Sequence, residues 1–214
     1  MSVTSASVRL VLASQSPRRA DLLRLAGYRF DIQPAHVDET PREGEQPGAF
    51  VERLAREKAA AILRLRPDDV VVGADTVVVV NHVVLGKPND AVHACDMLRR
   101  LSGRTHEVLT GVAVSAAGRT EAEVARTLVQ FTHLTEEDLA WYVATGESAD
   151  KAGGYGIQGL ASRFVERIEG SYGNVVGLPV SVVDRLLRAV APGQSFDDSG
   201  PTPENGADLA SSAV

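Results

Sequence analysis

The chain has 214 residues, 44% of them hydrophobic and 23% charged, with a formal net charge of −6. This length and composition predict one α/β domain with a sizeable core. The acidic balance argues against a nucleic-acid-binding protein, which would present a basic face, whereas a small anionic ligand needs only a local cluster of bases.

Cysteine usage and the first residues bear on where the protein works. Cys95 is the only cysteine, so no intramolecular disulfide can form, and a reducing cytoplasm is favoured. The opening residues lack the basic region and apolar stretch of an export signal, and no apolar run approaches ~18 residues. We therefore expect a soluble cytoplasmic protein that does not bind membranes. The oligomeric state stays open, a homodimer included.

The first third of the chain alternates between strand and helix patterns. Residues 8–13 are apolar enough for a buried strand, and Ser16-Pro17 then predicts a helix start, with the helix ending at Gly27. Residues 28–34 predict a second strand. A polar loop follows, and residues 47–66 predict a long amphipathic helix.

The middle of the chain is richer in strands. Residues 70–72 predict a short central strand ending at Gly73-Ala74-Asp75, and residues 77–85 predict a hairpin. Further predictions are a helix over 91–101, long strands over 107–115 and 121–133 joined at Ala117-Gly118, a helix with a capping box at Thr135, and a helix over 179–190. We assign residues 1–190 to one domain and 191–214, rich in Pro, Gly, Ser and Asp, to a disordered acidic tail.

Two arginines stand where a helix begins. Arg18 and Arg19 fall in the first turn after Ser16-Pro17, where positive charge opposes the helix dipole at ~0.3–1 kcal/mol each. They are either a tolerated solvated pair or part of a polyphosphate site formed with backbone N–H groups. The pattern alone does not decide between the two.

Other single residues have equally plain alternatives. Asp75 follows an apolar strand, where ligands gather in open α/β sheets, but taken alone the pattern favours an Asp that ends the strand through an Asx-turn. Glu39 reads as a solvated loop acid, and Lys58 reads as a surface lysine of the long helix. Lys87, in Gly86-Lys87-Pro88, could be a point charge for phosphate, although the motif is not a phosphate loop.

The glycine-rich segment 150–159 contains a literal GxGxxG from Gly154 to Gly159. No apolar strand precedes it, so we reject a dinucleotide-binding fold. The glycines instead predict a backbone that passes close to a ligand, and Gln158 offers an amide to a base edge. The five histidines are scattered without ligand spacing, which argues against a zinc site.

Taken together, these residues favour phosphoryl chemistry. Bases can neutralise a polyphosphate, while acids such as Glu39 and Asp75 can hold Mg²⁺ or Mn²⁺ through oxygen ligands.

The sequence resembles the Maf family of nucleoside triphosphate pyrophosphatases. The matching segments occur in the family's order over roughly residues 8–190 and comprise SQSPRR (14–19), VDE (37–39), LAREKA (54–59), GADTVV (73–78), GKP (86–88), SGRTHEVLTGV (102–112), DKAGGYGIQG (150–159) and FVERIEGSYGNVVGLPV (164–180).

That resemblance implies an elongated α/β fold, a mixed sheet flanked by helices with a central cleft between two lobes, like that of inosine triphosphatases. It implies cleavage of a nucleoside triphosphate between the α- and β-phosphates, with a divalent metal cation (Mg²⁺ or Mn²⁺). Asp75 matches the catalytic proton acceptor. The positions around the nucleotide are matched by Arg18, Glu39, Lys58, Lys87 and Gln158.

From the residues and this resemblance together we assign substrate binding to Arg18, Arg19, Lys58, Lys87 and Gln158, and metal binding, directly or through water, to Glu39 and Asp75. The GYGIQG form resembles the subgroup that acts on dTTP and UTP. Two alternatives stay open: a pyrophosphatase for other or modified nucleotides, and a cell-division regulator that binds a nucleotide without turnover. A carboxylate base would favour turnover, since a binding module needs only the cations.

Overall fold

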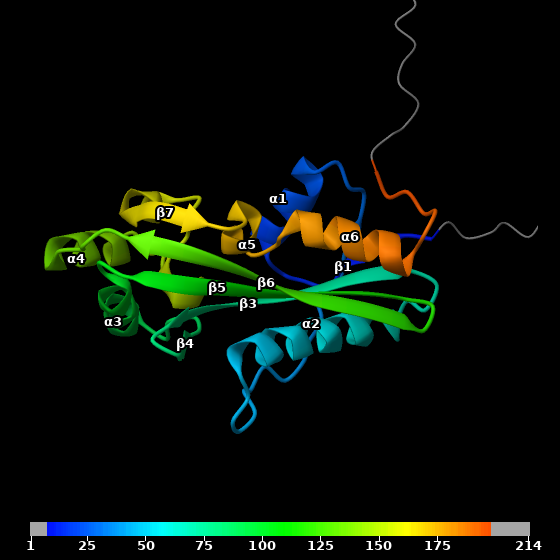
Figure 1. Cartoon of the computed structure of the whole chain (residues 1–214), viewed down its shortest axis with the longest axis horizontal. Coiled ribbons are helices and arrows are strands. Elements are labelled where there is room, and N and C mark those ends of the chain that lie inside the picture. The colour runs from blue at the N-terminus through cyan, green and yellow to red at the C-terminus, as the bar shows by residue number, and fades with distance from the viewer. Residues whose placement is uncertain (1–7, 198–214) are drawn as a thin grey trace, which may run out of the picture.

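The computed structural model describes residues 8–197, which form an open seven-stranded mixed sheet with helices on both faces (Figure 1). The strands are β1 (Leu10–Leu12), β2 (Asp31–Ile32), β3 (Val70–Val80), β4 (Val83–Leu85), β5 (Thr105–Ala116), β6 (Arg119–Phe131) and β7 (Val165–Glu169). The α-helices are α1 (Pro17–Leu25), α2 (Pro47–Leu63), α3 (Ala91–Leu101), α4 (Glu136–Ala144), α5 (Tyr172–Val176) and α6 (Val180–Val190), and two 3₁₀ helices are η1 (Ala152–Gly154) and η2 (Leu160–Phe164). The predicted fold class, an elongated mixed sheet flanked by helices, is confirmed.

The order of strands leaves a gap along one edge of β3. The sheet runs β2-β1-β3-β5-β6-β7, and β5 pairs with β3 along almost its whole length. On the opposite edge, parallel β1 pairs with residues 70–72 and antiparallel β4 pairs with residues 78–80. Within residues 8–197, no strand therefore pairs with residues 73–77 on that edge.

Helix α2 covers one face of the sheet (Figure 1), and its backbone lies very close to two strands. A Cβ atom at Gly73 of β3 would lie 2.2 Å from the carbonyl oxygen of Ala55, and one at Gly111 of β5 would lie 2.2 Å from that of Val51. Only glycine fits such an approach of backbone to backbone. These two glycines therefore let the helix rest on the centre of the sheet.

The opposite face carries two separate apolar clusters. One packs α1 and α6 against β1 and the first half of β3, with Leu23 and Leu178 fully buried. The other packs α3 and α4 against the second half of β3 and the end of β6, with Phe131 and Tyr142 at its centre. The two clusters occupy opposite ends of the elongated sheet, and the gap beside β3 lies between them.

The prediction that the central strand stops at Val72 is wrong. β3 continues through Asp75 to Val80, and Asp75 is paired with Gly111 of β5. Gly73 and Asp75 are poor strand formers, but β5, which pairs with β3 along almost its whole length, supplies the hydrogen bonds that propensity does not. Asp75 is consequently a mid-strand residue and not a strand terminator.

Some of the other local predictions are confirmed and others are wrong. The bounds of α3, the capping box at Thr135 and the β3–β4 hairpin are confirmed. The second strand is shorter than predicted, and β7 was not predicted at all, because it lies in a segment rich in glycine and charge.

Part of the predicted tail lies within the described residues. Phe196 is buried in the cluster around α6, and its carbonyl oxygen accepts a hydrogen bond from the N–H of Arg29. Phe196 thus packs on the domain, whereas residues 192–195 are exposed, and residues 198–214 of the predicted tail lie outside the described residues. Among the described helices, none is long and apolar enough to cross a membrane.

One buried histidine predicts an acid-sensitive stability. His106 is 2% exposed, and its Nε2 lies 2.8 Å from the Tyr155 hydroxyl. Burial lowers the pKa of His106 from 6.5 to about 4. Between these values the unfolded chain binds more protons than the folded one, so this contribution to stability is complete above pH 6.5 and is lost as the pH falls.

Replacing His106 with Phe, which suits the edge-to-face contact with Phe131, should remove that part of the pH dependence. Urea unfolding at pH 7.5 and pH 5 should show that the wild type loses about 2 kcal/mol more than the variant over this interval. Equal losses would mean that His106 does not titrate differently in the folded state.

Candidate active site

A cleft of about 1400 Å³ opens where β3 lacks a partner strand. Its walls come from the turn before α1, the polar loop before α2, the middle of β3, the segment after β4, and the glycine-rich segment. Every residue that the sequence assigned to the site lines this cleft, namely Arg18, Arg19, Glu39, Lys58, Asp75, Lys87 and Gln158. Residues far apart in the chain thus meet in one place.

At the centre of the cleft a lysine stands between two carboxylates. Lys58 Nζ lies 2.6 Å from Asp75 Oδ1 and 2.6 Å from Glu39 Oε1. The Lys58 side chain is 9% exposed and that of Asp75 13%, whereas that of Glu39 is 58% exposed. A buried ammonium is costly unless it is paired, and here two acids pair with it. The default interpretation of Lys58 as a surface lysine is wrong.

Strand alternation explains why Asp75 meets α2. Successive side chains of a strand point to opposite faces, and Val71, Val77 and Val79 pack on the α2 face. Asp75 shares their parity, so its carboxylate points toward Lys58 of α2. Thr76 therefore points to the opposite face, between the two apolar clusters.

The Arg19 guanidinium makes most of its hydrogen bonds to other groups of the protein. Its Nε donates to Gly177 O (2.8 Å), Nη1 to Ser14 Oγ (3.2 Å) and Ala74 O (2.9 Å), and Nη2 to Thr76 Oγ1 (3.0 Å). A guanidinium has five N–H donors, so these four bonds leave one for a ligand. Burial lowers the pKa of Arg19, while Asp75 opposes that shift. Through its hydrogen bond to Ala74 O, Arg19 occupies part of the β3 edge that no strand pairs with.

Arg18 reaches across the cleft to the glycine-rich segment. Its Nη1 lies 2.9 Å from Asp150 Oδ2, and the other carboxylate oxygen of Asp150 lies 2.6 Å from Lys151 Nζ. Asp150 is 62% exposed, and solvent-exposed ion pairs contribute little free energy. An anionic ligand could therefore replace Asp150 as the ion-pair partner of the Arg18 guanidinium.

The glycine-rich segment is held by Tyr142 of α4 and by Glu147, which follows that helix. Leu160 N–H donates to Glu147 Oε2 (2.9 Å), and Gly156 N–H donates to the Tyr142 hydroxyl (3.3 Å). A Cβ atom at Gly159 would lie 2.4 Å from the Glu147 carboxylate, so a larger residue there would have to displace that side chain. Gln158 stands between these anchors, exposed on the cleft wall. Gly156 and Gly159 also line the cleft, and the close approach of this backbone to a ligand stays a prediction.

The charges in the cleft favour ionised acids. Burial raises the pKa of Glu39, but Lys58, Lys87 and Arg19 outweigh it and hold that pKa below its ordinary value. The pKa of Asp150 falls to about 2, because Lys151 and Arg18 outweigh the effect of burial. Both carboxylates are therefore negative at neutral pH.

The residues fit a divalent cation that arrives with its ligand, and not a preformed metal cage. No group of three or more His, Cys, Asp and Glu side chains converges anywhere in residues 8–197. Glu39 and Asp75 each give one oxygen to Lys58, which leaves the second oxygen of each carboxylate available. One or two carboxylates together with substrate phosphates are the usual ligands of Mg²⁺.

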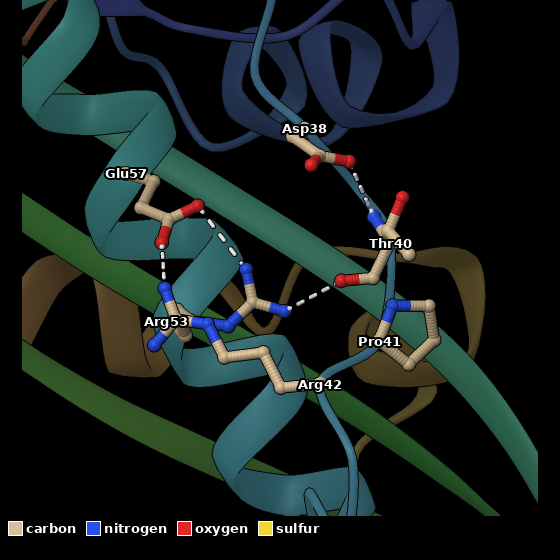
Figure 2. Close-up of a pocket in the computed structure, with 6 residues that line it drawn as sticks. All are labelled: Asp38, Thr40, Pro41, Arg42, Arg53 and Glu57. Carbon is tan, nitrogen blue, oxygen red and sulfur yellow. Dashed lines mark hydrogen bonds and ion pairs between the residues drawn. The ribbon is translucent and has the colours of Figure 1, made fainter.

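A second hollow, of about 250 Å³, lies beside the polar loop at the outer side of α2 (Figure 2). It is lined by Asp38, Thr40, Pro41, Arg42, Arg53 and Glu57. Its charged groups already have partners in the protein, since Glu57 accepts from both arginines, Arg53 also donates to Glu45, and Asp38 accepts from the Thr40 N–H. It is smaller than the usual ligand pocket of about 300–1,000 Å³, so the large cleft is the candidate site.

Comparison of the sequence with known proteins shows the family to which the chain belongs. Residues 9–190 match the sequence profile of the family described as Maf-like protein. The chain belongs to the Maf-like family.

Several Maf-like relatives are named dTTP/UTP pyrophosphatase. That of Syntrophus aciditrophicus is 49% identical over 182 residues, which cover 84% of this chain and 89% of the relative. That of Koribacter versatilis is 50% identical over 179 residues, covering 84% and 93%. That of a Geobacillus species is 52% identical over 182 residues, covering 85% and 96%.

Three residues of this Maf-like site were missed by sequence reasoning: Thr76, Glu147 and Arg53. Thr76 and Glu147 anchor Arg19 and the glycine-rich segment, and Arg53 binds the polar loop. Thr76 lies in the GADTVV segment (73–78), from which no role was predicted for it, whereas Glu147 and Arg53 lie outside the matching segments. The burial of Lys58, by contrast, had a signal, because positions 51, 55, 58 and 62 follow helical spacing on the apolar side of α2.

Replacing Gly73 with Ala should displace α2 and separate Lys58 from Asp75. The added Cβ atom meets rigid backbone, so we expect a loss of about 1–3 kcal/mol in unfolding free energy. Gly48→Ala is the matched control, since a Cβ atom there has nothing within 4 Å. Chemical denaturation of both variants checks this, and equal stability of the two would contradict the close packing.

Proposed function

We propose that this Maf-like protein is a nucleoside triphosphate pyrophosphatase, which hydrolyses the α–β phosphoanhydride bond to give the monophosphate and pyrophosphate. The names of relatives about 50% identical over most of the chain support the reaction. The site geometry supports it independently, because a carboxylate base and phosphate-binding cations face the same cleft.

The observation that carries the proposal is the arrangement Glu39–Lys58–Asp75. A module that only holds a nucleotide needs cations, but it has no need of two carboxylates pointing at the place where phosphate would bind. Near a polyphosphate such acids would weaken affinity through repulsion. Their presence favours turnover over the alternative of a regulator that binds without hydrolysis.

We assign Asp75 as the group that accepts a proton from the attacking water. Oδ1 is held by Lys58, and no hydrogen bond or ion pair in the described part of the chain engages Oδ2. Oδ2 is thus the atom able to accept the proton. Lys58 keeps the carboxylate oriented, and its ammonium offsets the repulsion between Asp75 and Glu39.

The cations on the cleft walls suit the leaving pyrophosphate. Arg18 can exchange Asp150 for a phosphate oxygen, and Lys87, exposed and also lining the cleft, can act as a point charge. Arg19 would contribute its one remaining N–H donor. The positive charge of these groups would stabilise negative charge that develops as the anhydride bond breaks.

We further propose that Glu39 and Asp75 contribute to binding a divalent cation, Mg²⁺ or Mn²⁺, together with the substrate phosphates. Glu39 would bind it directly and Asp75 through water, because Asp75 Oδ2 accepts the proton. Such a cation would acidify water and neutralise phosphate charge. Glu39 is suited to this role because its carboxylate is exposed to the cleft and its pKa is lowered by the surrounding cations.

The substrate preference that we propose is for dTTP and UTP. It rests on the names of the relatives and on Gln158, whose exposed amide lies on the cleft wall and can both donate to O4 and accept from N3–H of thymine or uracil. We place the enzyme in the cytoplasm, where its single cysteine stays reduced and its substrates occur.

Incubation of the protein and Mg²⁺ with dTTP, UTP, CTP and GTP tests the proposal, with separate assays for pyrophosphate and orthophosphate. Pyrophosphate should appear first, and kcat/KM should be higher for dTTP and UTP than for CTP and GTP. Orthophosphate as the first product would refute the reaction. One common kcat/KM for all four would refute only the pyrimidine preference.

A further inference from the structure

The loop that carries Glu39 is long and irregular. Residues 33–46 contain no helix or strand, and loops of this length inside a compact domain are uncommon unless they are functional. Glu39 lies near the middle of it, and its ion pair with Lys58 depends on where the loop lies. Something must therefore hold this loop against α2.

Arg53 of α2 provides that hold. Its Nε and Nη2 donate to the two carboxylate oxygens of Glu45 at 2.6 and 2.8 Å, a bidentate pair whose side chains are 13% and 9% exposed. Nη2 also donates to the carbonyl oxygen of Thr40 at 3.2 Å, in the residue directly after Glu39. One guanidinium thus binds the loop at two places.

The surrounding groups fix the guanidinium in turn. Glu57, one turn further along α2, accepts from Arg53 at 3.2 Å and from Arg42 of the loop at 3.1 Å (Figure 2). The ring of Phe50 lies under the Arg53 guanidinium, 5.4 Å from its central carbon. Arg53 is therefore held on one side by the helix while it binds the loop on the other.

We propose that Arg53 is a positioning residue for hydrolysis, which holds the polar loop so that Glu39 meets Lys58 in the cleft. This inference rests on the role proposed above for Glu39. Lysine could not replace Arg53, because a single ammonium lacks the planar fork that reaches both Glu45 oxygens and the Thr40 carbonyl at once. The Glu45 carboxyl stays ionised in any ordinary assay, since Arg53 lowers its pKa to about 2.

The first test is a double-mutant cycle between Arg53→Met and Glu39→Gln, with dTTP as the substrate. Arg53→Met should lower kcat/KM about tenfold, because misplacing a reacting group by a small distance is costly. In the Glu39→Gln background the same change should cost less than about twofold, since Arg53 acts through Glu39. Glu45→Gln removes the other half of the clamp and should reproduce the cycle if Arg53→Met folds poorly.

Arg56→Met is the matched control. Arg56 lies on the same helix and forms a similar ion pair with Glu52, with Nε at 2.9 Å from Oε1, but no interaction joins it to the loop within the described residues. Its replacement should leave kcat/KM unchanged in both backgrounds.

Hydrogen–deuterium exchange supplies a readout that does not depend on activity. The N–H of Arg42 donates to Glu45 Oε2, so it should be protected only while Arg53 holds Glu45. Exchange in a peptide covering residues 40–45 should speed up about tenfold in Arg53→Met and not in Arg56→Met.

The outcomes separate the two proposals. A wild type that releases no pyrophosphate would overturn the proposed function and this inference with it. An active wild type overturns only this inference if Arg53→Met is as active as Arg56→Met, if its loss is undiminished in the Glu39→Gln background, or if exchange over residues 40–45 does not change.

Discussion

The close contact between α2 and the sheet underlies the whole site. Gly73 and Gly111 bring the helix backbone to a distance that no other residue would allow, and this places Lys58 within 2.6 Å of Asp75. A buried lysine at this depth requires a negative partner, and a buried aspartate beside it requires a positive one. The same packing that stabilises the fold therefore holds two charged side chains in a fixed relation.

The second constraint is the gap between β1 and β4. Because neither strand reaches residues 73–77, the middle of β3 is open on one edge, and Arg19 occupies part of that edge by binding Ala74 O. The alternation of side chains then sends Asp75 to the α2 face and Thr76 to the other. One strand thus supplies the reactive carboxylate on one face and the anchor of an arginine on the other, and segments from both ends of the sheet can meet a ligand there.

Much of this could be predicted from sequence, for identifiable physical reasons. Helices α1, α3 and α4 begin at recognisable caps, and the β3–β4 hairpin has a turn at Asn81-His82 with positive φ at both residues. The full length of β3 was not predicted, because Gly73 and Asp75 have low strand propensity. Both residues face α2, which the local sequence does not reveal. Pairing with distant β5 decided the conformation.

The site, like the fold, divides into residues that could be predicted from the sequence and contacts that required the structure. The identities of Glu39, Lys58 and Asp75 came from resemblance to a family, but the lysine bridge between the two acids needed the structure, since residues 39, 58 and 75 come from a loop, a helix and a strand. Arg53 and Glu147 had no sequence signal, because each acts by holding backbone of another segment and not through a motif.

The most direct test of the central claim is the turnover number of Asp75→Asn, measured with dTTP and Mg²⁺ beside a nucleotide-binding measurement. Asn keeps the size of the side chain and its contact with Lys58 but cannot accept the proton from water, so kcat should fall by about 10²–10⁴-fold. The dissociation constant for the nucleotide and the melting temperature should stay close to the wild-type values. A kcat within about twofold of wild type would contradict the account, because Asp75 would then serve only to neutralise Lys58.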